Sequence, residues 1–205
     1  LSGTVKNLKV TDVTVERWKS DQGANALAKS LQNAKVSRLQ LKNILLAGGD
    51  NTGALAGTAQ NTTISEVWAE GLNINPYGPA FAGKTDLMVG GLIAQLNGGV
   101  HVNDSYAGGE ITVRSNTQGG VFGYNNYETE NTVKQVVSNM RTKSTSPQTD
   151  GAGFIGMVGF DGSMATWMEN NIAIGEAGEN RAQGSVGEAY RFATKGNSNT
   201  AIEFG

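Results

Sequence analysis

One short pattern recurs along most of the sequence, and this self-similarity limits the possible folds more than any single residue does. Each copy begins with a small residue and an apolar residue. A short polar loop follows, and then a segment in which an apolar residue is followed by two polar ones. The first steps are Ala26-Leu27, Ala54-Leu55, Gly91-Leu92, Gly120-Val121 and Gly153-Phe154. The segments are Val10-Thr11-Asp12-Val13, Val36-Ser37-Arg38-Leu39, Ile64-Ser65-Glu66-Val67, Val102-Asn103-Asp104-Ser105, Val133-Lys134-Gln135-Val136 and Met164-Ala165-Thr166-Trp167. They start 26 to 38 residues apart, a period typical of stacked repeats.

Strand-forming residues dominate each repeat. β-Branched and apolar residues alternate with polar ones, as in Leu39, Leu41 and Ile44. The segment Gly23 to Ala34 could form a helical face, but its counterparts Gly53 to Thr58 and Gly119 to Tyr124 are too rich in glycine for a helix, so we interpret all three as strands.

One coil of about three short strands cannot bury its own apolar face, but stacked coils can. The sequence therefore predicts an all-β fold, a right-handed parallel β-helix of about six coils with loop insertions, its hand taken from the crossover rule. We expect a single domain over residues 1–205, with regular coils over about 3–176 and an irregular final coil or cap over 177–205.

Glycine makes up 29 of the 205 residues, roughly twice the average of about 7%. Many glycines stand beside the apolar residue of each repeat, as Gly91, Gly120 and Gly153 do. We expect them to allow tight corners and close backbone approach.

Charge is low and balanced, with 16 basic and 18 acidic residues. This balance argues against nucleic acid or an anionic membrane as a partner. The absence of cysteine excludes disulfides and thiolate metal sites. No apolar run approaches the ~18 residues of a membrane span, so membrane insertion is not expected. The chain starts at Leu1 inside a repeat, and we interpret it as a piece of a longer protein.

The segment Gly90-Gly91-Leu92-Ile93-Ala94, followed by Val102 to Ile111, resembles the Gly-Leu repeat motif called GLUG. Gly119 to Gly123 and Gly151 to Gly156 match the first half of that motif. The opening Val5-Lys6-Asn7-Leu8-Lys9-Val10, with Ala24 to Lys29, is similar to the non-catalytic N-terminal repeat region of streptococcal zinc metallopeptidases that include the immunoglobulin A proteases.

The resemblance implies a secreted or wall-anchored bacterial protein at the cell surface or outside the cell. Those peptidases hold zinc with a His-Glu-x-x-His helix. This chain has one histidine, His101, followed by Val102, so no catalytic or metal-binding residue is carried over and zinc is expected only in a parent catalytic domain. The implied partners are other domains of the parent chain and a host glycoprotein such as immunoglobulin A.

Other catalytic interpretations have less support in the residues. His101 stands in a turn without a nucleophile elbow, and we interpret it as a solvated histidine. The pairs Glu128 with Glu130 and Asp161 with Glu169 could serve a glycosidase or bind calcium, but nothing in the sequence brings them together.

The candidate partner-binding residues are aromatic. Tyr77 and Phe81 lie in the long insertion Asn73 to Asp86, and Tyr124 and Tyr127 flank two asparagines. Exposed aromatic residues suit recognition of protein or glycan surfaces, although a loop folded over the core would use them as a lid. Tyr106, Phe122, Phe154 and Trp167 occupy repeat positions, where we expect core or stacking contacts.

The sequence thus favours a non-catalytic module of a zinc metallopeptidase that acts as spacer and docking surface. Two alternatives stay open: a stalk or ligand-binding module of a bacterial adhesin, and a polysaccharide-active β-helix enzyme. The enzyme would need acidic and basic residues that converge on one face of a coil.

Overall fold

All regular structure in the described part of the chain is β-strand. The computed structural model describes residues 1–17, 19, 21–75, 87–113, 117–125, 130–144, 151–158, 166–174, 195–197 and 200–202. The strands are β1 (Gly3–Glu16), β2 (Ala28–Gln32), β3 (Ala34–Ala47), β4 (Thr52–Gly53), β5 (Ala56–Gln60), β6 (Thr63–Ile74), β7 (Met88–Gly90), β8 (Ile93–Leu96), β9 (His101–Val113), β10 (Thr117–Gly119), β11 (Phe122–Asn125), β12 (Asn131–Ser144), β13 (Gly151–Ala152), β14 (Ile155–Val158), β15 (Thr166–Glu169), β16 (Ile172–Ile174), β17 (Lys195–Asn197) and β18 (Thr200–Ile202).

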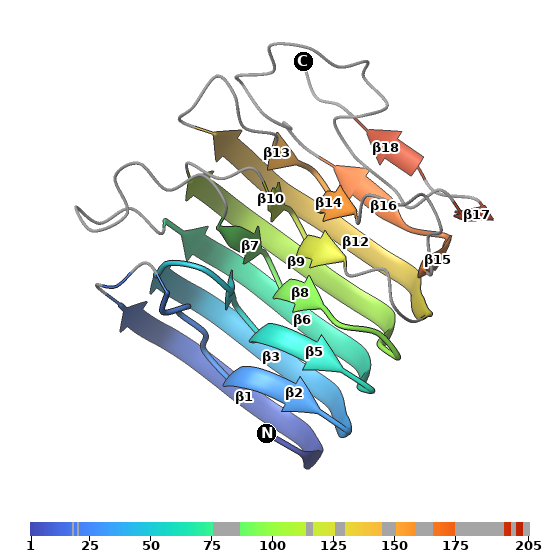
Figure 1. Cartoon of the computed structure of the whole chain (residues 1–205), viewed down its shortest axis with the longest axis horizontal. Coiled ribbons are helices and arrows are strands. Elements are labelled where there is room, and N and C mark those ends of the chain that lie inside the picture. Colours follow the sequence, from blue (N-terminus) through green and yellow to red (C-terminus); the bar gives the residue numbers. More distant parts are fainter. Residues whose placement is uncertain are drawn as a thin grey trace.

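The strands form three parallel sheets that share one stacking direction. Sheet A has the order β1-β3-β6-β9-β12-β15-β17, with β16 and β18 attached; sheet B has the order β2-β5-β8-β11-β14, and sheet C the order β4-β7-β10-β13. The long strands of sheet A make one layer, and the short strands of sheets B and C lie over it (Figure 1). The chain is therefore a parallel β-solenoid, as the sequence predicts.

The solenoid has about four turns, fewer than the six predicted. Sheet C begins only at β4, which follows β3, so the turns with a strand in each of the three sheets begin at β3, and the passage from β1 to β2 has no strand in sheet C. The sequence count was too high because it scored one long strand as one coil. We call each level of sheet A a rung.

A residue with left-handed backbone angles bends the chain at the same register position in six successive rungs. These first-corner residues have φ between 47° and 55° and are Asn7, Arg38, Glu66, Asp104, Gln135 and Asn170. A left-handed residue breaks the strict inward and outward alternation of a strand. Two neighbouring side chains, such as Ser37 and Arg38, therefore both point outward between the buried Val36 and Leu39. The two adjacent polar residues of each repeat therefore mark the position of this corner.

The register corrects two members of the repeat. Val5 pairs with Val36 and Leu8 with Leu39, so the first copy is Val5 to Leu8. Val10 to Val13 instead faces Leu41 to Ile44, at a second left-handed corner formed by Asp12, Asn43 and Gly71. In the rung of β15 and β16, Met168 pairs with Val133, so the corner is Met168 to Asn171 and not Met164 to Trp167.

Interior side chains stack in columns along the axis. One column is apolar in six successive rungs and consists of Val5, Val36, Ile64, Val102, Val133 and Met168. The next column contains Leu39 and Val67, with the exposed Leu8 at its first-rung end, and Val136 lies in the same column beside Ser105. Val36, Val67 and Val136 are at most 1% exposed, so these columns form the core.

Glycine makes the tight turn from sheet C to sheet B. A Cβ on Gly91 would overlap the carbonyl oxygen of Gly120, and a Cβ on Gly120 would overlap that of Gly153. Successive rungs therefore pack backbone against backbone at this turn, which confirms the structural role predicted for Gly91 and Gly120.

Buried polar side chains fill the gaps that corners leave in the backbone ladder. Asn171 accepts a hydrogen bond from the Val136 N–H at 2.9 Å and donates to the Val133 carbonyl at 2.9 Å. Asn131 accepts from the Val100 N–H at 2.9 Å. Each side chain satisfies backbone groups of the preceding rung that would otherwise be buried without a partner.

Candidate functional site

Two exposed indoles stand on the outward face of sheet A, each in the same local arrangement. Trp68 is 49% exposed and Trp167 is 45% exposed. Each indole is followed two residues later by a glutamate, Glu70 or Glu169. Because alternate strand residues share a face, the glutamate points outward beside the indole. We call these groups the Trp68 cluster and the Trp167 cluster.

A lysine of the preceding rung completes each cluster. Lys42 Nζ lies 3.1 Å from Glu70 Oε1, and Lys134 Nζ lies 3.0 Å from Glu169 Oε2. The Trp68 Nε1–H donates to Glu70 Oε2 at 3.2 Å. These contacts fix the carboxylate between an indole and an ammonium group.

The two carboxylates have lowered pKa values. The hydrogen bond from Trp68, followed by the hydrogen bond from Lys42, holds the pKa of Glu70 below its usual value. For Glu169 the hydrogen bond from Lys134 comes first, then its charge and the Trp167 indole, and these lower the pKa. Both glutamate side chains keep about a third of their surface in contact with solvent, at 35% and 32%, so the pairs add little stability and mainly hold the side chains in place.

The Trp68 ring is also stacked on a neighbouring rung. Trp68 pairs with Tyr106 across β6 and β9, and their ring centroids lie 4.2 Å apart at an interplanar angle of 16°. Gly108 leaves room for the tyrosine, because a Cβ there would overlap the Tyr106 hydroxyl. Asn139 Nδ2 donates to that hydroxyl at 3.3 Å. The expected stacking role of Tyr106 is confirmed.

The other repeat-position aromatics divide between core and surface. Phe122 and Phe154 are fully buried and pack edge to face, with centroids 6.0 Å apart. The core or stacking role predicted for Trp167 is wrong, because this residue pairs with Thr132 on the outward face of sheet A and is exposed. A repeat position alone did not tell which face the side chain takes.

Of the four predicted partner-binding residues, the structure describes one. Tyr124 lies on β11, half-buried, in register with Gln95 of β8 and Met157 of β14. Tyr77, Phe81 and Tyr127 lie outside the described residues, so the roles proposed for them stay predictions. Tyr124 is therefore the one member of this set whose place in the fold is known.

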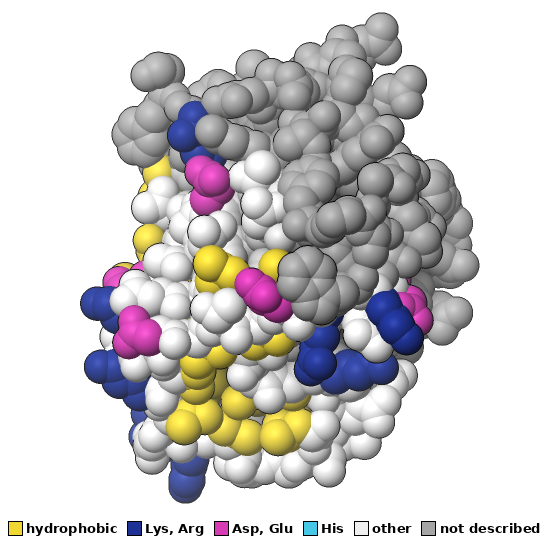
Figure 2. Space-filling model, turned by 90° about the vertical axis from the view of Figure 1, so that its left-hand side faces the viewer, with side chains coloured by type: hydrophobic (Ala, Val, Ile, Leu, Met, Phe, Trp, Pro, Cys, Tyr) yellow, Lys and Arg dark blue, Asp and Glu magenta, His cyan; other side chains and the backbone are white. Residues whose placement is uncertain are grey.

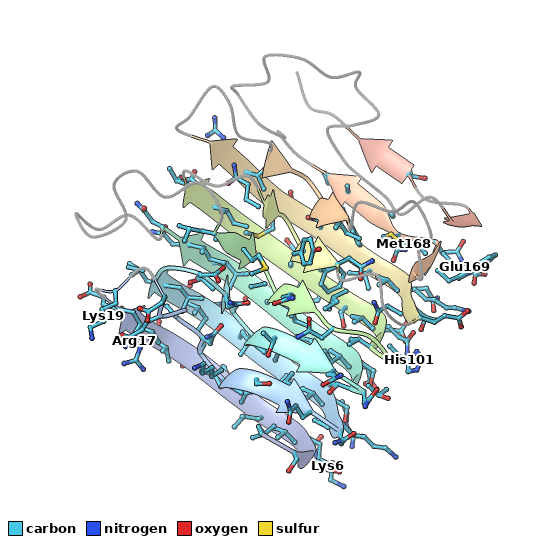
Figure 3. The ribbon with its side chains drawn as sticks, viewed as in Figure 1. Lys6, Arg17, Lys19, His101, Met168 and Glu169 are labelled. Carbon is cyan, nitrogen blue, oxygen red and sulfur yellow. The ribbon has the colours of Figure 1, made fainter. Side chains whose placement is uncertain are left out.

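His101 begins β9 and is exposed, and its Nδ1 lies 2.8 Å from Thr132 Oγ1 of the next rung. In Figure 3 it lies at the same edge of the stack as Met168 and Glu169. Of the predicted carboxylate pairs, Glu169 is bound to Lys134 and Glu130 is exposed, whereas Glu128 and Asp161 lie outside the described residues. Among the described residues no group of three or more His, Asp or Glu side chains is placed to hold a metal ion.

Comparison of the chain with known protein families, with curated proteins and with solved structures found no match. Within the described residues no helix is long and apolar enough to span a membrane. Sequence reasoning missed the Trp68 and Trp167 clusters. The signal was the shared Trp-x-Glu spacing in Trp68-Ala69-Glu70 and Trp167-Met168-Glu169, together with a lysine one repeat earlier.

Proposed function

We propose that this chain is a non-catalytic β-solenoid module of a secreted or wall-anchored bacterial zinc metallopeptidase, which spaces the catalytic part and docks a host glycoprotein such as immunoglobulin A. The parentage rests on the resemblance of the repeat residues. The docking role rests on one observation, the pair of exposed indoles held on the outward face of sheet A.

The spacing role is supported by the continuity of sheet A. The pairing of β1 with β3 and of β9 with β12 each includes 12 registered residues. Every rung shares backbone hydrogen bonds and interior columns with its neighbours, so bending the stack would break many contacts at once.

The docking role is supported by the rigidity of the indoles. Trp68 is fixed by Glu70 and by Tyr106, so binding a partner would sacrifice little side-chain entropy. Tryptophan is also the side chain that most often dominates protein interfaces.

The first test is enzymatic. The purified chain should hydrolyse neither immunoglobulin A nor a uronate polymer, with or without added zinc. Turnover that survives repurification would contradict the non-catalytic role.

The second test measures binding of immunoglobulin A by surface plasmon resonance. Trp167→Ala should weaken binding by at least about five-fold, the equivalent of about 1 kcal/mol. Leu45→Ala is the matched control, because Leu45 is also an exposed apolar side chain of sheet A, at 36% exposure. Equal effects of the two substitutions, or no binding by the parent chain, would refute docking through the indoles.

A further inference from the structure

A polar groove opens where the chain passes from β1 to β2. The segment of residues 22–26 lies against the next turn: Gly49 N–H donates to the Gln22 carbonyl at 2.8 Å, and Ala26 N–H to the Ala54 carbonyl at 3.1 Å. The groove has a volume of about 310 Å³, within the range of small-ligand sites. A hollow of about 90 Å³ shares several of its walls and extends it to Asn51 and Thr58.

The groove contains charged groups without partners. Arg17, Asp21 and Lys29 are exposed at its rim, and among the described residues none of the three forms an ion pair. Figure 3 places Arg17 beside Lys19 at one end of β1, with Lys6 at the other end. Figure 2 views the molecule from the end of β1 that carries Arg17 and Lys19 in Figure 3 and shows several Lys and Arg side chains on this face.

One residue that lines the hollow, Asn51, has a buried acceptor. Asn51 Nδ2 donates to Asp50 Oδ2 at 3.0 Å, whereas the buried Asn51 Oδ1 has no hydrogen-bond partner. Asp50 is occupied by the backbone, because its Oδ1 accepts from the N–H groups of Asn51 and Met88 at 2.9 Å each. Asn51 Oδ1 therefore has an unused acceptor position, which a ligand donor such as a hydroxyl group reaches only if the side chain turns toward the hollow.

The balanced charge of the chain conceals a strong segregation. Residues 1–47 hold eight of the 16 basic residues and three of the 18 acidic ones, so this part carries an excess of five positive charges. The remaining residues carry an excess of seven negative charges. The groove lies in the basic part, which attracts anions.

A line of hydrogen-bonding side chains continues from the groove across sheet B. Ser30 of β2 is in register with Thr58 of β5, Thr58 with Gln95 of β8, and Gln95 with Tyr124 of β11. All four are half-buried, and Thr58 Oγ1 donates to Ser30 Oγ at 2.9 Å. Two hydroxyls, an amide and a phenol thus recur at the rung spacing of about 4.8 Å.

We propose that the groove and this line bind an acidic oligosaccharide, at a site separate from the exposed indoles of sheet A. Arg17 and Lys29 would pair with a sugar carboxylate. Asp21 would accept from sugar hydroxyls, as would Asn51 Oδ1 once its side chain turns toward the hollow, and further sugar units would follow Ser30, Thr58 and Gln95 to the Tyr124 ring. A compact anion would use the cations alone and leave this line of side chains without contacts.

Isothermal titration calorimetry with tetragalacturonate tests this assignment. The purified chain should bind the oligomer, and its neutral methyl ester should bind at least about ten-fold more weakly. The double variant Arg17→Gln, Lys29→Gln should lose about ten-fold in affinity or more. The control Lys6→Gln, Lys35→Gln removes the same charge from sheet A positions outside the groove and should change affinity less than about two-fold.

Gln95→Ala separates the oligosaccharide from a simpler anion, because only an extended ligand reaches β8; it should weaken tetragalacturonate and leave inorganic phosphate unaffected. Equal binding of phosphate, of an acidic peptide or of a free amino acid would overturn the assignment, as would equal losses in the two double variants. The docking role is tested separately: immunoglobulin binding that persists after removal of its glycans would uphold docking while tetragalacturonate fails.

Discussion

The two halves of the solenoid stack their rungs in the same way but differ in the side chains that fill their interiors. In the lower rungs, residues 1–75, the described buried polar residues are Thr52 and Thr62. In the upper rungs, residues 87–174, they are Ser105, Gln118, Asn125, Asn131, Ser138, Thr142 and Asn171. The lower half therefore depends mainly on apolar burial, and the upper half adds hydrogen bonds from side chains to the backbone.

The corners differ as well. β1, β3 and β6 each have two left-handed corners, whereas β12 has one, and the register shifts between Ala69 and Leu72 where β6 meets β9. One fold therefore accommodates two strand shapes, provided that neighbouring rungs change at a bulge.

The largest effect should come from a charge in the lower interior. Val67→Asp would bury an unpaired carboxylate in the Leu8–Leu39 column and should destabilise the protein by about 3 to 5 kcal/mol. Chemical denaturation measures the loss. Thr63→Asp, an exposed position of the same strand, should change stability by less than about 0.5 kcal/mol.

Val67→Asn sharpens this contrast. The position of residue 67 relative to Leu39 and Val36 matches that of Asn171 relative to Val136 and Val133. The amide could therefore hydrogen-bond to the backbone of the preceding rung, as Asn171 does. We expect less than half the loss seen with Val67→Asp. Equal losses would mean that the two halves do not share a corner geometry.

The converse change is next in size. Asn171→Leu leaves the Val136 N–H and the Val133 carbonyl without their side-chain partner and should cost about 2 to 3 kcal/mol. Amide hydrogen exchange should accelerate at Val136 in particular. An unchanged exchange rate there would show that Asn171 acts by packing alone.

Gln118→Leu should stabilise the upper half. Gln118 is fully buried, and neither polar atom of its side chain has a hydrogen-bond partner. An apolar side chain of similar size removes this desolvation penalty, and we expect a gain of about 1 to 2 kcal/mol in thermal or chemical unfolding. A loss of stability would indicate that a buried water serves the amide.

A smaller gain should come from the corner that both halves share. Arg38→Gly in β3 and Gln135→Gly in β12 relieve a left-handed backbone that disfavours a side chain, at φ 53° and 55°. Each should stabilise by roughly 0.5 to 1 kcal/mol after the entropy lost by glycine is subtracted. Opposite signs in the two strands would show that the corners are not equivalent.

The smallest effect is electrostatic. Trp68→Phe keeps the ring but removes the indole N–H, so the pKa of Glu70 should rise toward its ordinary value of 4.5 in an NMR titration. A lowered pKa in the folded state gives stability that is present above the unfolded value and lost as pH falls through the folded one. The variant should thus lose less stability on acidification below pH 4.5, while Glu169 provides an unchanged internal reference.

The repeat pattern sufficed to predict the stacked parallel strands, because a column such as Val36, Ile64 and Val102 needs apolar residues at one period. It could not locate the corners, because Val10 to Val13 and Val5 to Leu8 have the same order of apolar and polar residues. The sequence pattern missed the copy Met168 to Asn171 because it required an apolar residue at its end. Asn171 takes that position and hydrogen-bonds to the backbone instead.

The surface sites were harder to predict. The Trp68 cluster depends on Lys42 and Tyr106, which come from neighbouring rungs and become adjacent only once the register is known. The groove depends on charges that balance over the whole chain and separate along the axis. The composition of the whole chain shows neither the cluster nor the separation of charge.

The spacing of the first-corner residues shows that the length of the molecule along its axis does not depend on the number of residues in each turn. Successive members from Asn7 to Asn170 are 28 to 38 residues apart, yet each interval advances the stack by one rung. Asn7 and Asn170 are therefore about 24 Å apart along the axis, at about 4.8 Å per rung. Extra residues within one interval therefore lengthen the chain without raising the stack, so the residue count and the height of the molecule vary independently.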